Sequence, residues 1–258
     1  MKCLSSSTLG KFLLGEFDEV WPVGQALLRI VRTRSLYRYH GIHLQHETLQ
    51  FEEELAAFTG ARHAVAVTSG TAALHTALGA LGVGPCQEVI IPAYLWVSIA
   101  AAVVNLGAIP VLAEIDETFC IDPADLKKKI TPRTSTILIA HMNSAPGNVF
   151  DLVKIARARN LFLLEDCAQC AAGRIYGQSV GSFGDIAIFS FQLNKNMTSG
   201  EGGAVITNDD TLWRRAVAIQ DVGYARDEWD RLQLEDAETC GWGRGYRLDE
   251  LRAAMLRV

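Results

Sequence analysis

The sequence predicts an α/β protein in which helices cover both faces of a mostly parallel sheet. Short apolar runs typical of strands alternate with longer segments whose apolar residues have helical spacing. Parallel strands need crossover connections, which helices normally supply, so this alternation favours a parallel sheet. The 258 residues can bury one large core, and a hydrophobic content of 49% is ordinary for a globular chain.

The predicted strands are apolar and bounded by turn residues, and they cover residues 63–67, 89–91, 109–115, 136–140, 161–164, 186–189 and 204–207. The predicted helices lie between or beside them and cover residues 45–58, 69–81, 95–106, 123–129, 150–159 and 246–258. In the first helix, Leu49, Phe51, Leu55 and Phe58 lie among acidic residues, and Gly60 is expected to end it.

One stretch has the length of a membrane span, because no charge occurs between Glu88 and Glu114. Pro92, Asn105 and Pro110 interrupt it and divide it into a strand, a helix and a second strand. We therefore expect a buried strand–helix–strand unit whose elements are apolar on all sides.

The composition excludes some classes of partner. A net charge of −5 gives no support for binding to nucleic acid or to an anionic membrane. The six cysteines are scattered, and residues 1–17 lack the long apolar run of a secretion signal. We expect reduced thiols in a cytoplasmic protein.

Three motifs follow predicted strands. Ser69-Gly70-Thr71 comes after the first strand, Asp166 after another, and Ser190 and Lys195 after a third, ahead of the glycine-rich run at 200–203. Ligands of parallel α/β sheets bind beyond the carboxyl ends of the strands. The sequence therefore predicts one site that gathers these residues at that edge.

From about Gly15 to Val258, these motifs resemble the DegT/DnrJ/EryC1/StrS family of sugar aminotransferases. The resemblance implies the large domain of a fold type I pyridoxal-phosphate (PLP) enzyme, with PLP bound covalently to Lys195. PLP enzymes must anchor the phosphate, protonate the pyridine nitrogen, hold the ring and exchange an imine. In such a site, a partly desolvated lysine acts as nucleophile and then as base.

Candidate residues exist for anchoring the phosphate and for protonating the pyridine nitrogen, and each candidate could instead have a purely structural role. The backbone amides of Gly70 and Thr71 at a helix start would bind the phosphate, and Ser190 would add a hydroxyl. Ser69-Gly70-Thr71 also fits a plain helix N-cap. Asp166 would pair with the pyridinium nitrogen, although an aspartate at a strand end also caps loops.

The resemblance also assigns the ring's neighbours. Asp166, Ala168 and Gln169 match a recurring family pattern, which implies that Ala168 packs against the ring and that Gln169 approaches its hydroxyl side. Trp96 matches the family's ring-stacking aromatic residue and would cover the other face. A tryptophan in the core is the alternative for this position.

The resemblance implies transfer of an amino group from glutamate or glutamine to a keto sugar, possibly nucleotide-linked, or to a keto-cyclitol. It also implies a homodimer, in which residues 34–39 would contribute to the partner's site. A PLP-dependent sugar dehydratase is a further alternative. Dehydratases of the family carry histidine at the position of Lys195, so the lysine argues against this alternative. A truncated non-catalytic remnant or PLP-binding fragment remains a second hypothesis.

The expected organisation is an N-terminal helical segment at 1–25, a PLP-binding large domain at 26–245, and the start of a helix at 246–258 that leads to an absent small C-terminal domain. Gly245 replaces an asparagine of the family pattern. Cys167 and Cys170 are spaced as a redox pair, but they flank Ala168 and Gln169. No metal site is expected, because no carboxylate or cysteine cluster accompanies the histidines near residue 43.

Overall fold

The computed structural model describes residues 17–227, 231–236 and 241–258. Its central sheet has seven strands in the order β1-β9-β8-β5-β4-β2-β3. They are β1 His63–Val67, β2 Glu88–Pro92, β3 Ile109–Ala113, β4 Thr134–Ala140, β5 Phe162–Asp166, β8 Ile186–Ser190 and β9 Gly203–Thr207. Strand β9 is antiparallel to both neighbours, and the other pairs are parallel. The predicted mostly parallel α/β sheet is confirmed.

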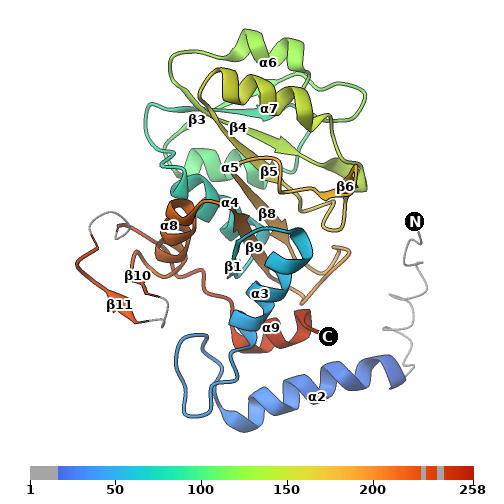
Figure 1. Ribbon diagram of the computed structural model, residues 1–258, viewed down its shortest axis with the longest axis vertical. Helices are drawn as coiled ribbons and strands as arrows, with labels where there is room; N and C mark the ends of the chain where they lie inside the picture. The colour runs from blue at the N-terminus through green and yellow to red at the C-terminus, as the bar shows by residue number, and fades with distance from the viewer. Residues whose placement is uncertain (1–16, 228–230, 237–240) are drawn as a thin grey trace.

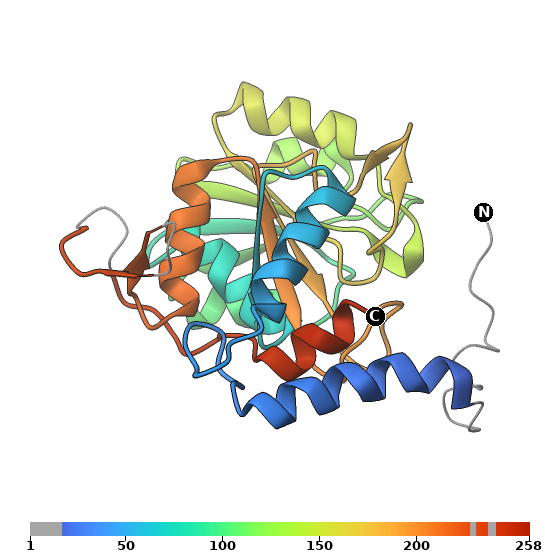
Figure 2. The ribbon, with the colours of Figure 1, turned by 60° about the horizontal axis from the view of Figure 1, so that its bottom comes forward.

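Helices surround the sheet (Figures 1 and 2). They are α2 Phe17–Thr33, α3 Glu47–Thr59, α4 Gly70–Ala80, α5 Ser98–Asn105, α6 Pro123–Lys129, α7 Val149–Ala158, α8 Asp210–Gln220 and α9 Glu250–Leu256, with a short 3₁₀ turn at Met142–Ser144. Two small hairpins, β6–β7 (Arg174–Ile175, Gln178–Ser179) and β10–β11 (Ala225–Arg226, Leu232–Gln233), lie outside the sheet. The sequence analysis predicts neither of the two hairpins, and it does not predict α8.

Alternate residues of the strands face different helices. Val65 and Val67 of β1 pack in the core beneath α4, α5 and α8, whereas Ala64 and Ala66 face α3 and α9. Residues of β2, β4 and β5 face α6 and α7 on that second side, for example Ile137. Strands β2, β8 and β9 are buried on both faces and are mostly apolar rather than alternating with polar residues, whereas the edge strand β3 is partly exposed.

The charge-free stretch forms β2, α5 and β3, as predicted. Within the part of the chain that the structure describes, every helix is too short or too polar to cross a membrane. The strand–helix–strand order is therefore confirmed, but the unit is only partly buried, since Leu112 of β3 and Val104 of α5 are exposed.

The last predicted helix is shorter than expected. The sequence predicts it over 246–258, but α9 begins at Glu250, capped by the Asp249 carboxylate, which accepts a hydrogen bond from the Arg252 N–H at 2.9 Å. The residues before it run along the sheet instead. Arg247 bridges Val67, and the Thr68 N–H donates to the Tyr246 carbonyl at 2.8 Å. Pairing with the end of β1 outweighs the local helical pattern.

Helix α2 packs along α9 at one end of the molecule (Figures 1 and 2). Ala26 and Ile30 of α2 are buried against Ala254. The boundary proposed at residue 25 falls inside this helix, and residues 1–16 of the predicted N-terminal segment lie outside the described residues.

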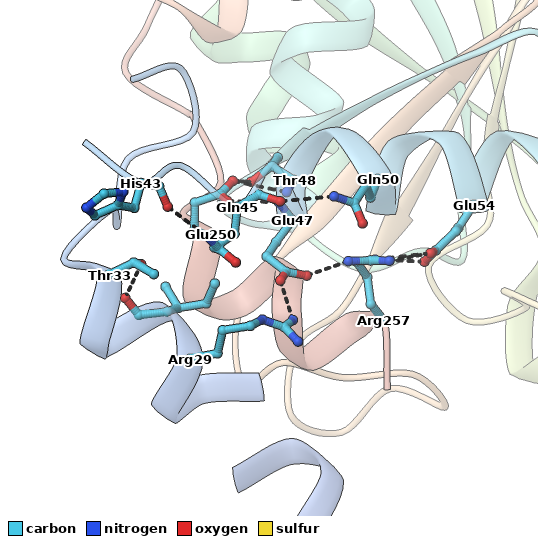
Figure 3. A network of polar contacts seen from close by, with 11 residues as sticks. Arg29, Thr33, His43, Gln45, Glu47, Thr48, Gln50, Glu54, Glu250 and Arg257 are labelled. Carbon is cyan, nitrogen blue, oxygen red and sulfur yellow. Dashed lines mark hydrogen bonds and ion pairs between the residues drawn. The ribbon is translucent and has the colours of Figure 1, made fainter. Parts of the chain in front are cut away.

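The start of α3 is capped from a distant part of the chain. His46 precedes α3 with a φ of 58° and supplies no side-chain cap. The buried Glu250 carboxylate takes that place, and it accepts from the Glu47 N–H at 2.8 Å, the Thr48 N–H at 3.0 Å and the Thr48 hydroxyl at 2.8 Å (Figure 3). A carboxylate at a helix N-terminus also complements the helix dipole. Glu250 thereby joins α9 to α3.

Ion pairs surround this cap. Glu47, itself buried, pairs with Arg29 of α2 and with Arg257, whose guanidinium also contacts Glu54 at 2.8 Å (Figure 3). Helices α2 and α3, which follow one another in the sequence, are thus fixed to α9, which comes much later.

Replacing Glu250 with glutamine should destabilise the fold by roughly 2–3 kcal/mol, because an amide group then faces backbone donors that need an acceptor. Urea unfolding should show a lower midpoint with an unchanged slope. Glu53→Gln, on the exposed side of α3, is the control and should change stability by less than about 0.5 kcal/mol. Equal midpoints for the two variants would contradict the capping role.

Candidate active site

Most of the predicted site residues gather at one edge of the sheet. Asp166 is the last residue of β5, Ser190 is the last residue of β8, and Ser69-Gly70 connects β1 to α4. Strands β5 and β8 are parallel neighbours, so their carboxyl ends lie side by side. The edge expected from the sequence is the one where these residues lie.

The turn before α4 presents free backbone amides. The Ser69 hydroxyl accepts a hydrogen bond from the Ala72 N–H at 3.0 Å, so this side chain is the N-cap of α4. This agrees with the alternative interpretation of Ser69-Gly70-Thr71 as a helix N-cap. The cap leaves the N–H groups of Gly70 and Thr71 in the first turn, where a helix has no internal acceptor for them. Such a turn binds anions through its amides and its dipole.

Glycine is required in this turn by close packing. A Cβ added to Gly70 would lie 2.7 Å from Cβ and 2.9 Å from Oγ of Ser190. A Cβ added to Gly203, at the start of β9, would lie 2.4 Å from the Ser69 carbonyl oxygen. The two glycines let the α4 turn pack against Ser190, so Gly70 and Ser190 are neighbours at this edge.

Asp166 is a buried carboxylate with little compensation. Its Oδ1 accepts from the Ala168 N–H at 2.8 Å. Burial raises the pKa of this carboxyl from its ordinary 3.8 to about 6, although the Ala168 amide and the nearby Lys195 act in the opposite direction. A cation placed beside Asp166 would relieve this penalty.

Lys195 lines a cavity of about 210 Å³ together with Ala168 and Gln169. The other lining residues are Asn143, Ser144, Ala171, Asn194 and Asn196. The cavity therefore brings three of the predicted residues together, and the charge of Lys195 acts on Asp166 behind it. Asn143 and Ser144 were not predicted, but they come shortly after β4, which ends at Ala140, so the rule of carboxyl ends could have found them.

Trp96 lies apart from this group. Its side chain is 67% exposed in the turn before α5, and it is not among the residues that line the cavity. The structure thus places Trp96 neither over the cavity nor in the core.

A second buried carboxylate holds the edge together. Glu165 Oε1 accepts from the backbone amides of Phe183 at 2.8 Å and Gly184 at 2.7 Å. Its Oε2 accepts from the Gly181 amide at 2.9 Å and from Nε2 of His141 at 3.0 Å. The imidazole proton lies on Nε2, because Nδ1 accepts from the Gly147 N–H at 3.1 Å. Glu165 therefore ties the end of β4, β5 and the loop before β8 to one another.

The surroundings of Glu165 argue against metal binding and against thiol redox chemistry here. Donor atoms of His141, Glu165 and Cys167 lie within 4.8 Å of one another, as in a metal site, but those of His141 and Glu165 are already used in hydrogen bonds. Burial raises the pKa of the Cys167 thiol well above its ordinary value, and that of Cys170 also rises. Both thiols are free and poorly suited to redox exchange.

The glycine at position 245 leaves room for a larger side chain. It bridges Asp221, and the nearest atom to an added Cβ is Nη2 of Arg247, at 3.7 Å. Packing within this chain therefore does not exclude the asparagine of the family pattern.

Comparison with known proteins identifies relatives of this chain. The model of the DegT/DnrJ/EryC1/StrS aminotransferase family matches residues 33–258. The chain is 42% identical over 211 residues to L-glutamine:2-deoxy-scyllo-inosose aminotransferase from Micromonospora echinospora, which covers 80% of this chain and 50% of that protein.

Solved structures share the fold. The crystal structure of 3-amino-5-hydroxybenzoic acid synthase aligns with a TM-score of 0.84 and 36% identity, over 94% of this chain and 61% of that one. NtdA from Bacillus subtilis with bound cofactor PMP aligns with a TM-score of 0.82 and 28% identity, over 93% and 52%.

The chain spans about half the length of the curated relatives it matches. The family model covers nearly all of the chain, from residue 33 onward. This chain belongs to the DegT/DnrJ/EryC1/StrS aminotransferase family.

Proposed function

We propose that this protein is a PLP-dependent aminotransferase that moves an amino group from glutamate or glutamine to a keto sugar or keto-cyclitol. The observation that carries the proposal is the convergence of Lys195, the poorly compensated Asp166 and the free amides of the α4 turn at one edge of the sheet. The Micromonospora relative, whose name gives glutamine as donor and a keto-cyclitol as acceptor, supports the same reaction.

The residues fit the cofactor's chemical groups. The amides of Gly70 and Thr71 and the Ser190 hydroxyl would hold the phosphate, and the packing of Gly70 on Ser190 is the cradle that a side chain would fill. Asp166 would face the pyridinium nitrogen, a cation that offsets the cost of burying this carboxylate. Ala168 and Gln169 would border the ring, and Trp96 would cover its other face after a rearrangement from its exposed position.

Bound PLP supplies a carbonyl for amine exchange and a sink for electrons released at the substrate carbon. Lys195 carries out the proton transfers in this proposal. Its Nζ would hold the cofactor, and once displaced by the incoming amine it would serve as the base that accepts and returns the donor's α-proton. Asp166 keeps its negative charge beside the ring nitrogen throughout.

We also propose that the protein is a cytoplasmic homodimer. Among the described cysteines, Cys86, Cys120, Cys167 and Cys170 are free thiols, which is consistent with a reducing compartment. Val97 and Val104 expose 68% and 57% of their surfaces beside and within α5, and these apolar side chains are available to a second copy.

Ser35, Arg38 and Tyr39 are buried within their own chain, whereas Arg34 and Leu36 are exposed, so Arg34 and Leu36 are the residues of 34–39 best placed to reach a partner. Sedimentation should give a mass near twice the 28.2 kDa of the chain. A monomer that keeps its full activity at high dilution would contradict the dimer.

The aminotransferase proposal is tested by reducing the PLP-loaded protein with borohydride and mapping the labelled peptides. The expected adduct is on Lys195, and Lys195→Ala should lose it together with at least about a hundredfold of any transfer from glutamine. Lys154→Ala, at an exposed lysine of α7, is the matched control and should keep both. Label spread over surface lysines would overturn the proposal and favour a non-catalytic fragment.

A further inference from the structure

One imidazole joins the two ends of the loop between β4 and α7, residues 141–148 (Figure 1). His141 follows the last residue of β4 and is 1% exposed. Its backbone N–H donates to the Asp166 carbonyl at 3.0 Å, which fixes the start of the loop on β5. Its Nδ1 accepts from the Gly147 N–H at 3.1 Å. The β4–α7 loop is therefore closed through the side chain of its own first residue.

The Gly147 end of the loop is packed into the core. Gly147 is buried, and a Cβ added to it would lie 2.7 Å from Sγ of the buried Cys120. A buried N–H needs an acceptor, and for Gly147 that acceptor is Nδ1 of His141. Without it, this end of the loop must either bury an unpaired N–H or move outwards to reach water.

The closed loop carries a strained turn that holds Gln169. Asn143 and Ser144 have φ values of 53° and 61°, in the left-handed range. The Asn143 N–H donates to Gln169 Oε1 at 3.1 Å, and the Ser144 N–H and hydroxyl donate to the Gln169 carbonyl oxygen at 2.9 and 3.1 Å. Backbone conformations of this kind persist only where the surroundings hold them. Releasing the Gly147 end would let the turn relax and would free Gln169.

Gln169 lies beside the position proposed for the cofactor. It lines the cavity at Lys195 together with Ala168, and the proposed function places both residues along the PLP ring. His141 is not among the described residues that line this cavity. It can therefore influence the ring only through residues that do, by way of the β4–α7 loop.

We propose that His141 is a positioning residue for cofactor binding. Its Nδ1 closes the β4–α7 loop, and the closed loop holds Gln169 against the PLP ring. This inference rests on the proposed function. The alternative is that His141 only stabilises the fold through Nε2, which donates to Glu165 at 3.0 Å. Because the two ring nitrogens have different partners, substitution can separate these roles.

Two substitutions each keep the role of one nitrogen. Asparagine places its Oδ1 near the position of Nδ1, so His141→Asn can still accept from the Gly147 N–H but is too short to reach Glu165. Glutamine places its Nε2 near that of the imidazole, so His141→Gln can still donate to Glu165 but offers Gly147 no acceptor. Both variants lose one buried hydrogen bond, and both should have a lower urea midpoint than the parent.

The two variants should differ in the loop and in PLP binding. In the cofactor-free chain, amide hydrogen exchange over residues 142–147 should be at least about tenfold faster in His141→Gln and unchanged in His141→Asn. The affinity for PLP, measured by equilibrium dialysis, should fall about three- to tenfold in His141→Gln and less than about twofold in His141→Asn. Equal effects of the two substitutions on either measurement, or a larger effect of asparagine, would overturn the inference.

Glu250→Gln is the matched control for lost stability. It weakens the cap of α3, and Glu250 does not line the cavity at Lys195. This variant should have a lower urea midpoint but the loop exchange and the PLP affinity of the parent. If its PLP affinity fell in proportion to its midpoint, His141 would act through stability alone, and the positioning role would be wrong.

The parent chain supplies a measurement that needs no variant to fold. Its Gly147 amide should exchange at least about a hundredfold more slowly than an unprotected glycine amide. An unprotected Gly147 amide would overturn the inference. A parent that bound no PLP would overturn the proposed function and with it the positioning role. Undiminished PLP binding by His141→Gln would overturn the positioning role alone and leave the aminotransferase proposal standing.

Discussion

The site depends on two adjacent buried carboxylates, Glu165 and Asp166, which differ in how many hydrogen bonds they accept. Glu165 accepts four hydrogen bonds from His141 and the 181–184 loop, and so binds three segments of the sheet edge together. Asp166 accepts one from the protein, and burial raises the pKa of its carboxyl to about 6. The Glu165 carboxylate holds the segments of the edge together. The Asp166 carboxylate would be stabilised by a cation bound beside it.

This difference couples stability to function. An aspartate whose pKa is higher in the folded chain than its ordinary 3.8 holds its proton more tightly when folded. Its contribution to stability is therefore present at low pH and is lost as the pH rises from about 4 through about 6. Above that range the chain without cofactor carries an unfavourable buried charge, and a pyridinium bound beside Asp166 would remove the penalty.

Much of this arrangement follows from sequence pattern alone. The apolar strands, the Gly60 stop and the motifs at strand ends place Asp166, Ser190 and Lys195 on one edge, because period and turn residues are local signals. Contacts between distant residues carry no such signal. Glu250 capping α3, the start of α9 at Glu250 and the hydrogen bonds of Glu165 depend on tertiary packing. The exposed position of Trp96 is also a property of the folded chain and not of its sequence neighbours.

The most direct test compares the unfolding free energy of the cofactor-free chain and of Asp166→Asn between pH 4 and pH 8. The asparagine keeps the Ala168 hydrogen bond but no charge, so the variant should become more stable than the parent as the pH rises, by roughly 1–3 kcal/mol at pH 8. Its affinity for PLP should fall at least about tenfold, because the charged partner of the ring nitrogen is gone. Glu117→Gln, at an exposed carboxylate, should alter neither property. An Asp166→Asn variant that is less stable than the parent at pH 8, or that binds PLP equally well, would contradict the account.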